Sequence, residues 1–255
     1  MGERYLMTGD SRAAVWFRIT GAMRFLSHAE TSRVFQRACA RAAIPVRYSE
    51  GFNPHPRLSL PLPRPVGVES EDELLVLRLC DDWEGAPVGS QAERETAMKQ
   101  ALAEQLPEGI DVLTVSLSAG IASFQPRSAE YVLPVRVGED AALAERLRDK
   151  IAKVMGSDRG MVERTTAEGR ATRSVDVRPF LCAIRLEDGN LIVQHLTGGA
   201  GSIRVDEILQ LFGLQAQDLA GPVRRTNVIW ETTESKTTSQ EPCVETRAED
   251  TEDAT

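Results

Sequence analysis

The spacing of apolar residues is the feature that most constrains the fold, because it alternates between strand and helix periods over the first 120 residues. Branched and aromatic residues at Val15–Ile19 predict a strand, and a glycine turn follows it. Ser27 and Glu30 then match a capping box, which predicts that a helix begins there. The patterns predict, in order, a strand at 15–19, a helix at 28–43, a short strand in a proline-rich stretch, a strand at 73–79, a helix at 91–106 and a strand at 110–117.

The second part of the chain partly repeats this order. Its patterns predict a strand at 131–137, a helix at 141–155, a hairpin of 175–186 with 191–196, a short helix at 205–212 and a last strand at 226–230. Strand-helix-strand-strand-helix-strand is the order of a ferredoxin-like fold. We therefore predict an α+β fold of two tandem ferredoxin-like (βαββαβ) halves, joined near 119–128.

The C-terminal segment differs in composition from the rest. The chain carries a net charge of −8, and residues 231–255 contain eight acids and two bases, which gives −6 for this segment alone. With so few apolar residues it cannot offset the entropy lost on ordering, so we expect a disordered acidic tail. The predicted organisation is a flexible N-terminus at 1–12, an arginine-rich ferredoxin-like domain at 13–120, a second ferredoxin-like domain at 128–230 and the tail at 231–255.

The opposite charge is concentrated near the N-terminus. Residues 11–65 hold nine arginines, no lysine and two acids, so the segment carries +7 within an acidic protein. Arginine pairs with phosphate through a planar fork of donors and stacks on bases, which indicates a surface for an anion, with RNA phosphate first. The residues that we expect to form it are Arg24, Ser27, His28, Arg33, Arg37, Arg41, Asn53, His55 and Arg57.

Two histidines fall within this segment. His28 lies in the first turn of its predicted helix, where unpaired amides favour an anion, and His55 lies in a stiff loop between two prolines. Three roles stay open for them: hydrogen bonding, anion binding, or acid–base or metal chemistry if they face each other. Two histidines alone make a weak metal site, and no Ser-His-Asp order or carboxylate pair stands out. We assign no catalytic residue, no metal and no cofactor.

The four cysteines are widely separated. None lies within four residues of another, which excludes a local zinc knuckle and the cysteine loop of a radical enzyme. Cys39, Cys80 and Cys182 lie in apolar stretches, so we expect buried, reduced thiols. Without a run of 18 apolar residues or the apolar core of a signal peptide, we expect a cytoplasmic protein away from membranes.

Three short motifs carry a resemblance. Residues 24–28 (RFLSH), 51–56 (GFNPHP) and 65–70 (PVGVES) are similar to those of the bacterial radical SAM-linked protein family, a domain of unknown function. The resemblance extends over about 15–230. It implies a companion role, because family members occur alone or fused behind a radical SAM, cobalamin-binding enzyme module. The partner enzyme would carry the iron–sulfur cluster.

These observations favour an accessory protein that binds tRNA or rRNA through the arginine-rich surface and assists a separate radical SAM enzyme. Two alternatives stay open. The fold prediction and His28 also suit a ferredoxin-like endoribonuclease, by analogy with the repeat-associated ribonucleases of CRISPR systems. An adaptor whose arginines bind an acidic protein, without RNA, is the third hypothesis.

Overall fold

The computed structural model describes residues 11–80, 87, 89–119, 122–138, 141–165, 172–198 and 201–234. Most of the predicted flexible N-terminus, residues 1–10, lies outside these ranges, as does the predicted acidic tail from residue 235 onward.

The first half contains the six predicted elements in the predicted order. They are β1 (Ser11–Ile19), α1 (His28–Arg41), β2 (Leu58–Ser59), β3 (Glu69–Arg78), α2 (Gln91–Ala103) and β4 (Ile110–Ala119), with a short 3-10 helix η1 (Gly21–Phe25) after β1. The capping box of Ser27 and Glu30 opens α1 as predicted, and Ser90 and Glu93 open α2 in the same way. Helix α1 stops where Ala43 adopts a positive φ ahead of Ile44.

The second half departs from the prediction at three places, one of which is a strand at Met161–Thr165 where none was predicted. Its elements are β5 (Ala122–Pro134), α3 (Ala141–Met155), β6 (Met161–Thr165), β7 (Thr172–Asp176), η2 (Arg178–Phe180), β8 (Leu181–Glu187), β9 (Asn190–Leu196), α4 (Val205–Phe212), η3 (Ala216–Asp218) and β10 (Arg224–Glu234). The predicted strand at 175–186 is wrong as a single element, because Pro179 in η2 lacks an amide donor and separates β7 from β8. Strand β5 begins nine residues before the predicted 131, because its first part pairs with the end of β10.

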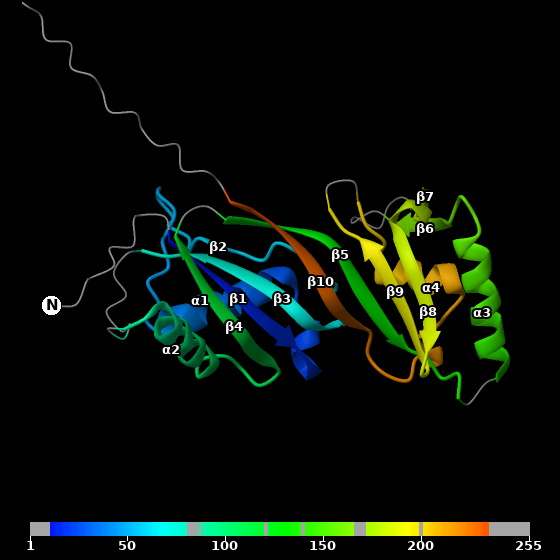
Figure 1. Ribbon diagram of the computed structural model, residues 1–255, viewed down its shortest axis with the longest axis horizontal. Helices are drawn as coiled ribbons and strands as arrows, with labels where there is room; N and C mark the ends of the chain where they lie inside the picture. The colour runs from blue at the N-terminus through cyan, green and yellow to red at the C-terminus, as the bar shows by residue number, and fades with distance from the viewer. Residues whose placement is uncertain are drawn as a thin grey trace, which may run out of the picture.

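One large mixed sheet runs through both halves. Its strand order is β4-β1-β3-β10-β5-β9-β8, with β2 beside β3, while β6 and β7 form a separate two-stranded sheet. The halves follow one another along the long axis of the molecule, and β10 and β5 are the strands of the second half that lie next to the first half (Figure 1). The prediction of an α+β fold is confirmed. The predicted domain boundaries stay a prediction, and β10 extends through Glu234, into the segment predicted as tail.

The halves are joined where β10 runs parallel to the beginning of β3. Arg225 of β10 pairs in register with Ser70, and its guanidinium is almost fully buried. It donates to a carboxylate oxygen of Glu73 at 2.5 Å and to the carbonyl oxygens of Pro63 at 3.1 Å and Leu62 at 3.0 Å. A buried charge is tolerated only when it is paired and hydrogen-bonded in this way, so the contact fixes β10 against β3.

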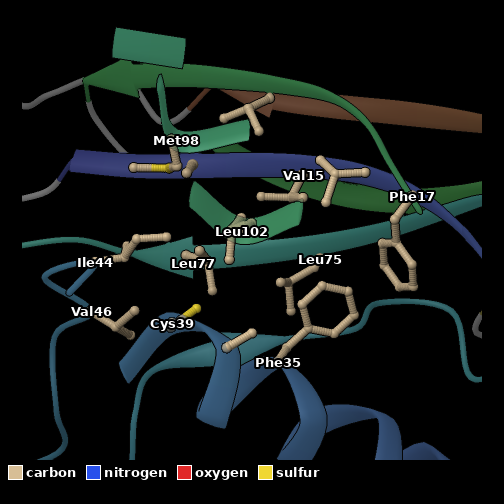
Figure 2. Close-up of a cluster of buried hydrophobic side chains, with 14 of the residues drawn as sticks. Val15, Phe17, Phe35, Cys39, Ile44, Val46, Leu75, Leu77, Met98 and Leu102 are labelled. Atoms are coloured by element: carbon tan, nitrogen blue, oxygen red, sulfur yellow. The ribbon is translucent and has the colours of Figure 1, made fainter. Parts of the chain in front are cut away.

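The helices α1 and α2 cover one face of the first-half sheet. Alternate residues of β1 and β3, such as Val15, Phe17 and Leu75, point toward Phe35 of α1 and Leu102 of α2 (Figure 2). Phe17 and Phe35 meet edge to face, with ring centroids 4.6 Å apart. The residues between them in the strands therefore point to the opposite face, which these two helices leave uncovered.

The prediction that three cysteines are buried is correct for one of them. Cys39 is buried in the first core, and burial raises the pKa of its thiol to about 12. Cys80 and Cys182 are exposed, so the prediction is wrong for both. Cys80 follows the end of β3 and Cys182 alternates away from the second core, so an apolar neighbourhood in sequence did not place either thiol inside.

Among the described helices, none has the length and apolar character needed to cross a membrane.

Candidate functional site

The fold separates the arginines of the N-terminal segment into sets with different surroundings. Arg64 is buried and Arg18 is paired with Asp111 at 2.8 Å. Arg24 lies over the ring of Phe25, 4.4 Å from its centroid. The +7 counted along the sequence is therefore not one continuous surface.

Arg64 has a structural role, because its hydrogen bonds go to backbone carbonyl groups of the protein. Its guanidinium donates to the carbonyl oxygens of Arg24 at 2.7 Å, Leu26 at 2.9 Å and Pro65 at 3.2 Å, and also to that of Val68. Burial lowers the pKa of this guanidinium. Arg64 thus fixes the backbone around the beginning of α1 and has its donors turned away from solvent.

The beginning of α1 is already occupied by a carboxylate. Ser27 accepts a hydrogen bond from the amide of Glu30, and the Glu30 carboxylate accepts from the Ser27 amide at 2.8 Å and the Ser27 hydroxyl at 2.7 Å. The hydrogen bond from the Ser27 side chain lowers the pKa of Glu30. Arg24 is close to a second acid, because its Nη1 lies 3.7 Å from Glu69. A bound anion at Arg24, Ser27 and His28 would have to compete with these carboxylates.

The two histidines do not face each other. His28 borders a cavity of about 10 Å³ together with Ile19 and Glu73. His55 lies in the loop between α1 and β2, whose ends hydrogen-bond to Arg78 at the other end of β3. Ile19 and Arg78 mark opposite ends of the sheet, since β3 extends about 26 Å from Ser70 to Arg78. The structure therefore offers no paired His28–His55 site, although each side chain is exposed.

The three arginines spaced by four along α1 are exposed, as predicted. Arg33, Arg37 and Arg41 lie on the outer side of α1, away from Phe35 and Ala38, which are buried against the sheet. They form a stripe on the helix-covered side of the first half.

A second group of arginines lies across the ends of β1 and β3. Arg12 of β1 and Arg78 of β3 are direct cross-strand partners. The Arg78 amide donates to the carbonyl of Arg57 at 3.0 Å, so Arg57 continues the row on the far side of β3. Arg57 was among the predicted site residues, whereas Arg12 and Arg78 were not.

This arginine row lines an open groove of about 480 Å³. We call it the arginine groove and define it by its lining residues: Arg12, Arg57, Leu58, Ser59, Pro61, Val76, Arg78, Ser123, Phe124 and Gln125. None of the lining residues that the structure describes is acidic. Arg12 is buried, so the groove presents two accessible cations, Arg57 and Arg78, together with uncharged polar groups and apolar side chains.

The wall opposite β2 comes from the beginning of β5. Phe124 packs edge to face on Trp16, with ring centroids 6.1 Å apart, and both lie against a small cluster of Ala14, Leu74 and Val76. This cluster lies on the sheet face opposite α1 and α2, since Ala14 and Val76 alternate with residues of the main core. The packing holds β5 across that face and gives the groove an aromatic side.

The prediction missed Arg78 and Phe124 for different reasons. Arg78 lies at the end of a predicted strand, and the residue opposite it depends on a pairing with β1 that the sequence does not show. Phe124 fell in the stretch interpreted as a connection between halves. An arginine at the end of an otherwise apolar strand was the one available signal.

Comparison with known proteins gives one family match. The profile of the family described as "Uncharacterized protein conserved in bacteria (DUF2344)" matches residues 12–205. A search of the curated proteins finds no match. Among solved structures, a protein described as a putative monooxygenase from Fusobacterium nucleatum subsp. nucleatum is 11% identical, with 89% of this chain and 96% of that chain covered, at a TM-score of 0.21. A TM-score this low supports no argument about fold or activity.

Proposed function

We propose that this chain, which belongs to the DUF2344 family of uncharacterized proteins conserved in bacteria, binds RNA through its phosphates in the arginine groove. Family membership agrees with the sequence-based expectation of a bacterial family of unknown function. The expected link to radical SAM enzymes is part of the proposal.

The arginine row is the observation that supports RNA binding most strongly. Arg57 is exposed and Arg78 is half-buried, and the hydrogen bond between their backbones keeps these two cations side by side on the groove. A ligand with closely spaced negative charges can bind both. The phosphate backbone of a nucleic acid has such spacing, and arginine is the side chain best suited to it.

The lining of the groove favours a nucleic acid over a small inorganic anion. A volume of about 480 Å³ is far larger than one phosphate needs. Phe124 supplies an aromatic side chain of the kind on which bases stack, and Ser59, Ser123 and Gln125 supply hydrogen-bonding groups. An RNA strand with phosphates beside the arginines and a base near Phe124 would contact the charged, the polar and the aromatic parts of the lining.

The biological role that we propose is that of an accessory protein. It would hold RNA for a separate radical SAM, cobalamin-binding enzyme, as the motif resemblance implies. The strand orders support interpreting each half as a ferredoxin-like unit: β4-β1-β3-β2 in the first half and β10-β5-β9-β8 in the second have the same relative order. In the second half, the β6–β7 hairpin is an insertion between α3 and β8.

Variants of three arginine sets test the binding site. The double variant Arg57→Ala/Arg78→Ala removes two groove cations, and the triple variant Arg33→Ala/Arg37→Ala/Arg41→Ala removes the stripe on α1. Arg146→Ala, on the exposed side of α3, is a matched control. Fluorescence anisotropy with a labelled single-stranded RNA of 12 nucleotides (a length of about one site) measures the affinity of the full chain.

We expect the groove variant to lose affinity by about a hundredfold or more, since it removes two charge-assisted contacts that contribute about 1.4 kcal/mol or more each. The stripe variant should lose less than the groove variant, and the control should bind like the unmodified chain. Equal affinity of the groove variant and the unmodified chain would overturn the assignment of the site.

A further inference from the structure

The loop between α1 and β2 is an ordered hairpin that adjoins the arginine groove. At its base, the Arg57 amide donates to the carbonyl of Arg47 at 2.7 Å. Further along, the Ser49 amide donates to the carbonyl of His55 at 2.8 Å, and the His55 amide donates to the Ser49 hydroxyl at 2.9 Å. We call residues 47–57 the GFNPHP hairpin (Figure 1).

The GFNPHP hairpin holds two aromatic side chains in solvent. Phe52 at its tip has a relative exposure of 105%, and Tyr48 on one arm has 53%. Gly51 supplies the turn beside Phe52, with φ of +118°. A single exposed apolar residue is ordinary on a protein surface, but here two rings share one hydrogen-bonded hairpin.

The charges around these rings indicate what they contact. Arg47 and Arg57 lie on the same hairpin, with Glu50 as its one acid. An apolar protein surface would be a poor match for rings set among cations. Bases attached to phosphates match both features, because the rings stack on the bases while the cations lie near the phosphates.

The hairpin and the groove are continuous. Arg57 lines the groove and begins the arm that leads to Phe52 five residues away, a span of at most about 17 Å. A strand bound in the groove can therefore extend along the hairpin without leaving the protein.

We propose that the ligand is single-stranded RNA, whose unpaired bases stack on Phe52 and Tyr48 beyond the groove. This inference rests on the proposed function. A duplex has its base faces covered and cannot use the rings. The hairpin thus gives the site a preference for unpaired RNA, while the arginines bind any closely spaced phosphates.

The test compares Phe52→Ala and Phe52→Trp in the full chain on three probes: a single-stranded RNA of mixed sequence, the same RNA annealed to its complement, and inorganic polyphosphate. Phe25→Ala is the matched control, because Phe25 is also an exposed phenylalanine (59%) but lies in η1. Phe52 has no buried surface to lose, so its variants should fold normally.

Phe52→Ala should weaken binding of single-stranded RNA by about fivefold to 150-fold, which corresponds to one stacked base. Phe52→Trp should restore it, and binding of duplex and polyphosphate should stay unchanged. If Phe52→Ala binds all three probes like the unmodified chain, the stacking role is wrong while RNA binding in the groove stands. If the unmodified chain binds none of the three probes, the proposed function itself fails.

Discussion

Arg12 and Arg78 lie directly opposite each other on the antiparallel strands β1 and β3, on the sheet face that the helices α1 and α2 leave uncovered. Arg12 is buried at this position, whereas Arg78 is half-buried and its backbone brings the exposed Arg57 beside it. Arg57 and Arg78 therefore place two cations on the lining of one groove, where we propose that closely spaced phosphates bind both.

Removing Arg78 should therefore affect RNA binding more than stability. We predict that Arg78→Thr changes the free energy of unfolding by less than about 1 kcal/mol, because threonine suits a strand. The same variant should bind RNA more weakly. Urea unfolding and anisotropy on the same preparation measure both, and a clear loss of stability would show that Arg78 has a structural role instead.

Glu73 and Arg225 form a buried ion pair whose disruption should be costly. Glu73→Gln or Arg225→Met alone leaves an uncompensated buried group and should lower the free energy of unfolding by about 3–5 kcal/mol. The double variant Glu73→Leu/Arg225→Met removes both charges and should recover part of that loss. Urea unfolding of the two single variants and the double variant measures these free energies of unfolding. Single variants that cost less than about 1 kcal/mol would mean that the pair does not hold β10 to β3.

Ser27 offers a way to separate helix capping from anion binding. Ser27→Ala should lower the free energy of unfolding by about 1 kcal/mol through loss of the cap, and Ser90→Ala should do the same in α2. Neither variant should change RNA affinity, because both caps lie outside the arginine groove. Weaker RNA binding for Ser27→Ala alone would favour the site first predicted at the beginning of α1.

His195 should make stability depend on pH. Burial lowers its pKa to about 4, below the ordinary value near 6.5. The unfolded chain therefore binds the proton more readily, and the stability present above pH 6.5 is lost as pH falls toward 4, by about 2 kcal/mol at pH 5. His195 stacks on Tyr131, so His195→Phe keeps a ring there.

Urea unfolding at pH 7.5 and pH 5 measures this dependence. The His195→Phe variant should lose less stability between the two pH values than the unmodified chain. His55→Ala serves as the control, because its side chain is exposed and its removal should leave the pH dependence as it was. If His195→Phe loses as much stability between the two pH values as the unmodified chain, the pH dependence arises from other groups.

Local signals explain which parts of the fold could be predicted from the sequence. The beginning of α1 depends on Ser27 and Glu30, three residues apart, so the capping box placed it correctly. The first part of β5 lacks clear alternation and contains Pro126, and its partner in β10 is about a hundred residues away. Pairing at such separation leaves no local pattern, so neither the first part of β5 nor the groove that it borders could be predicted.

The same distinction applies to the candidate site. The sequence showed an excess of arginine but not which side chains the fold would bury, and Arg64 proved to be buried. Arg57 was predicted from its neighbours in the chain. Arg12 and Arg78 belong with it only because β1 and β3 pair in one particular register.

The salt dependence of RNA binding tests the central claim most directly. For the unmodified chain, the logarithm of the affinity for single-stranded RNA should fall linearly with the logarithm of salt concentration, with a slope of about −1.4, or about −0.7 for each of two arginine contacts. Arg57→Ala/Arg78→Ala should bring the slope close to zero, while Arg146→Ala leaves it unchanged. A slope near zero for the unmodified chain, or a groove variant that keeps the slope of the unmodified chain, would contradict phosphate binding in the arginine groove.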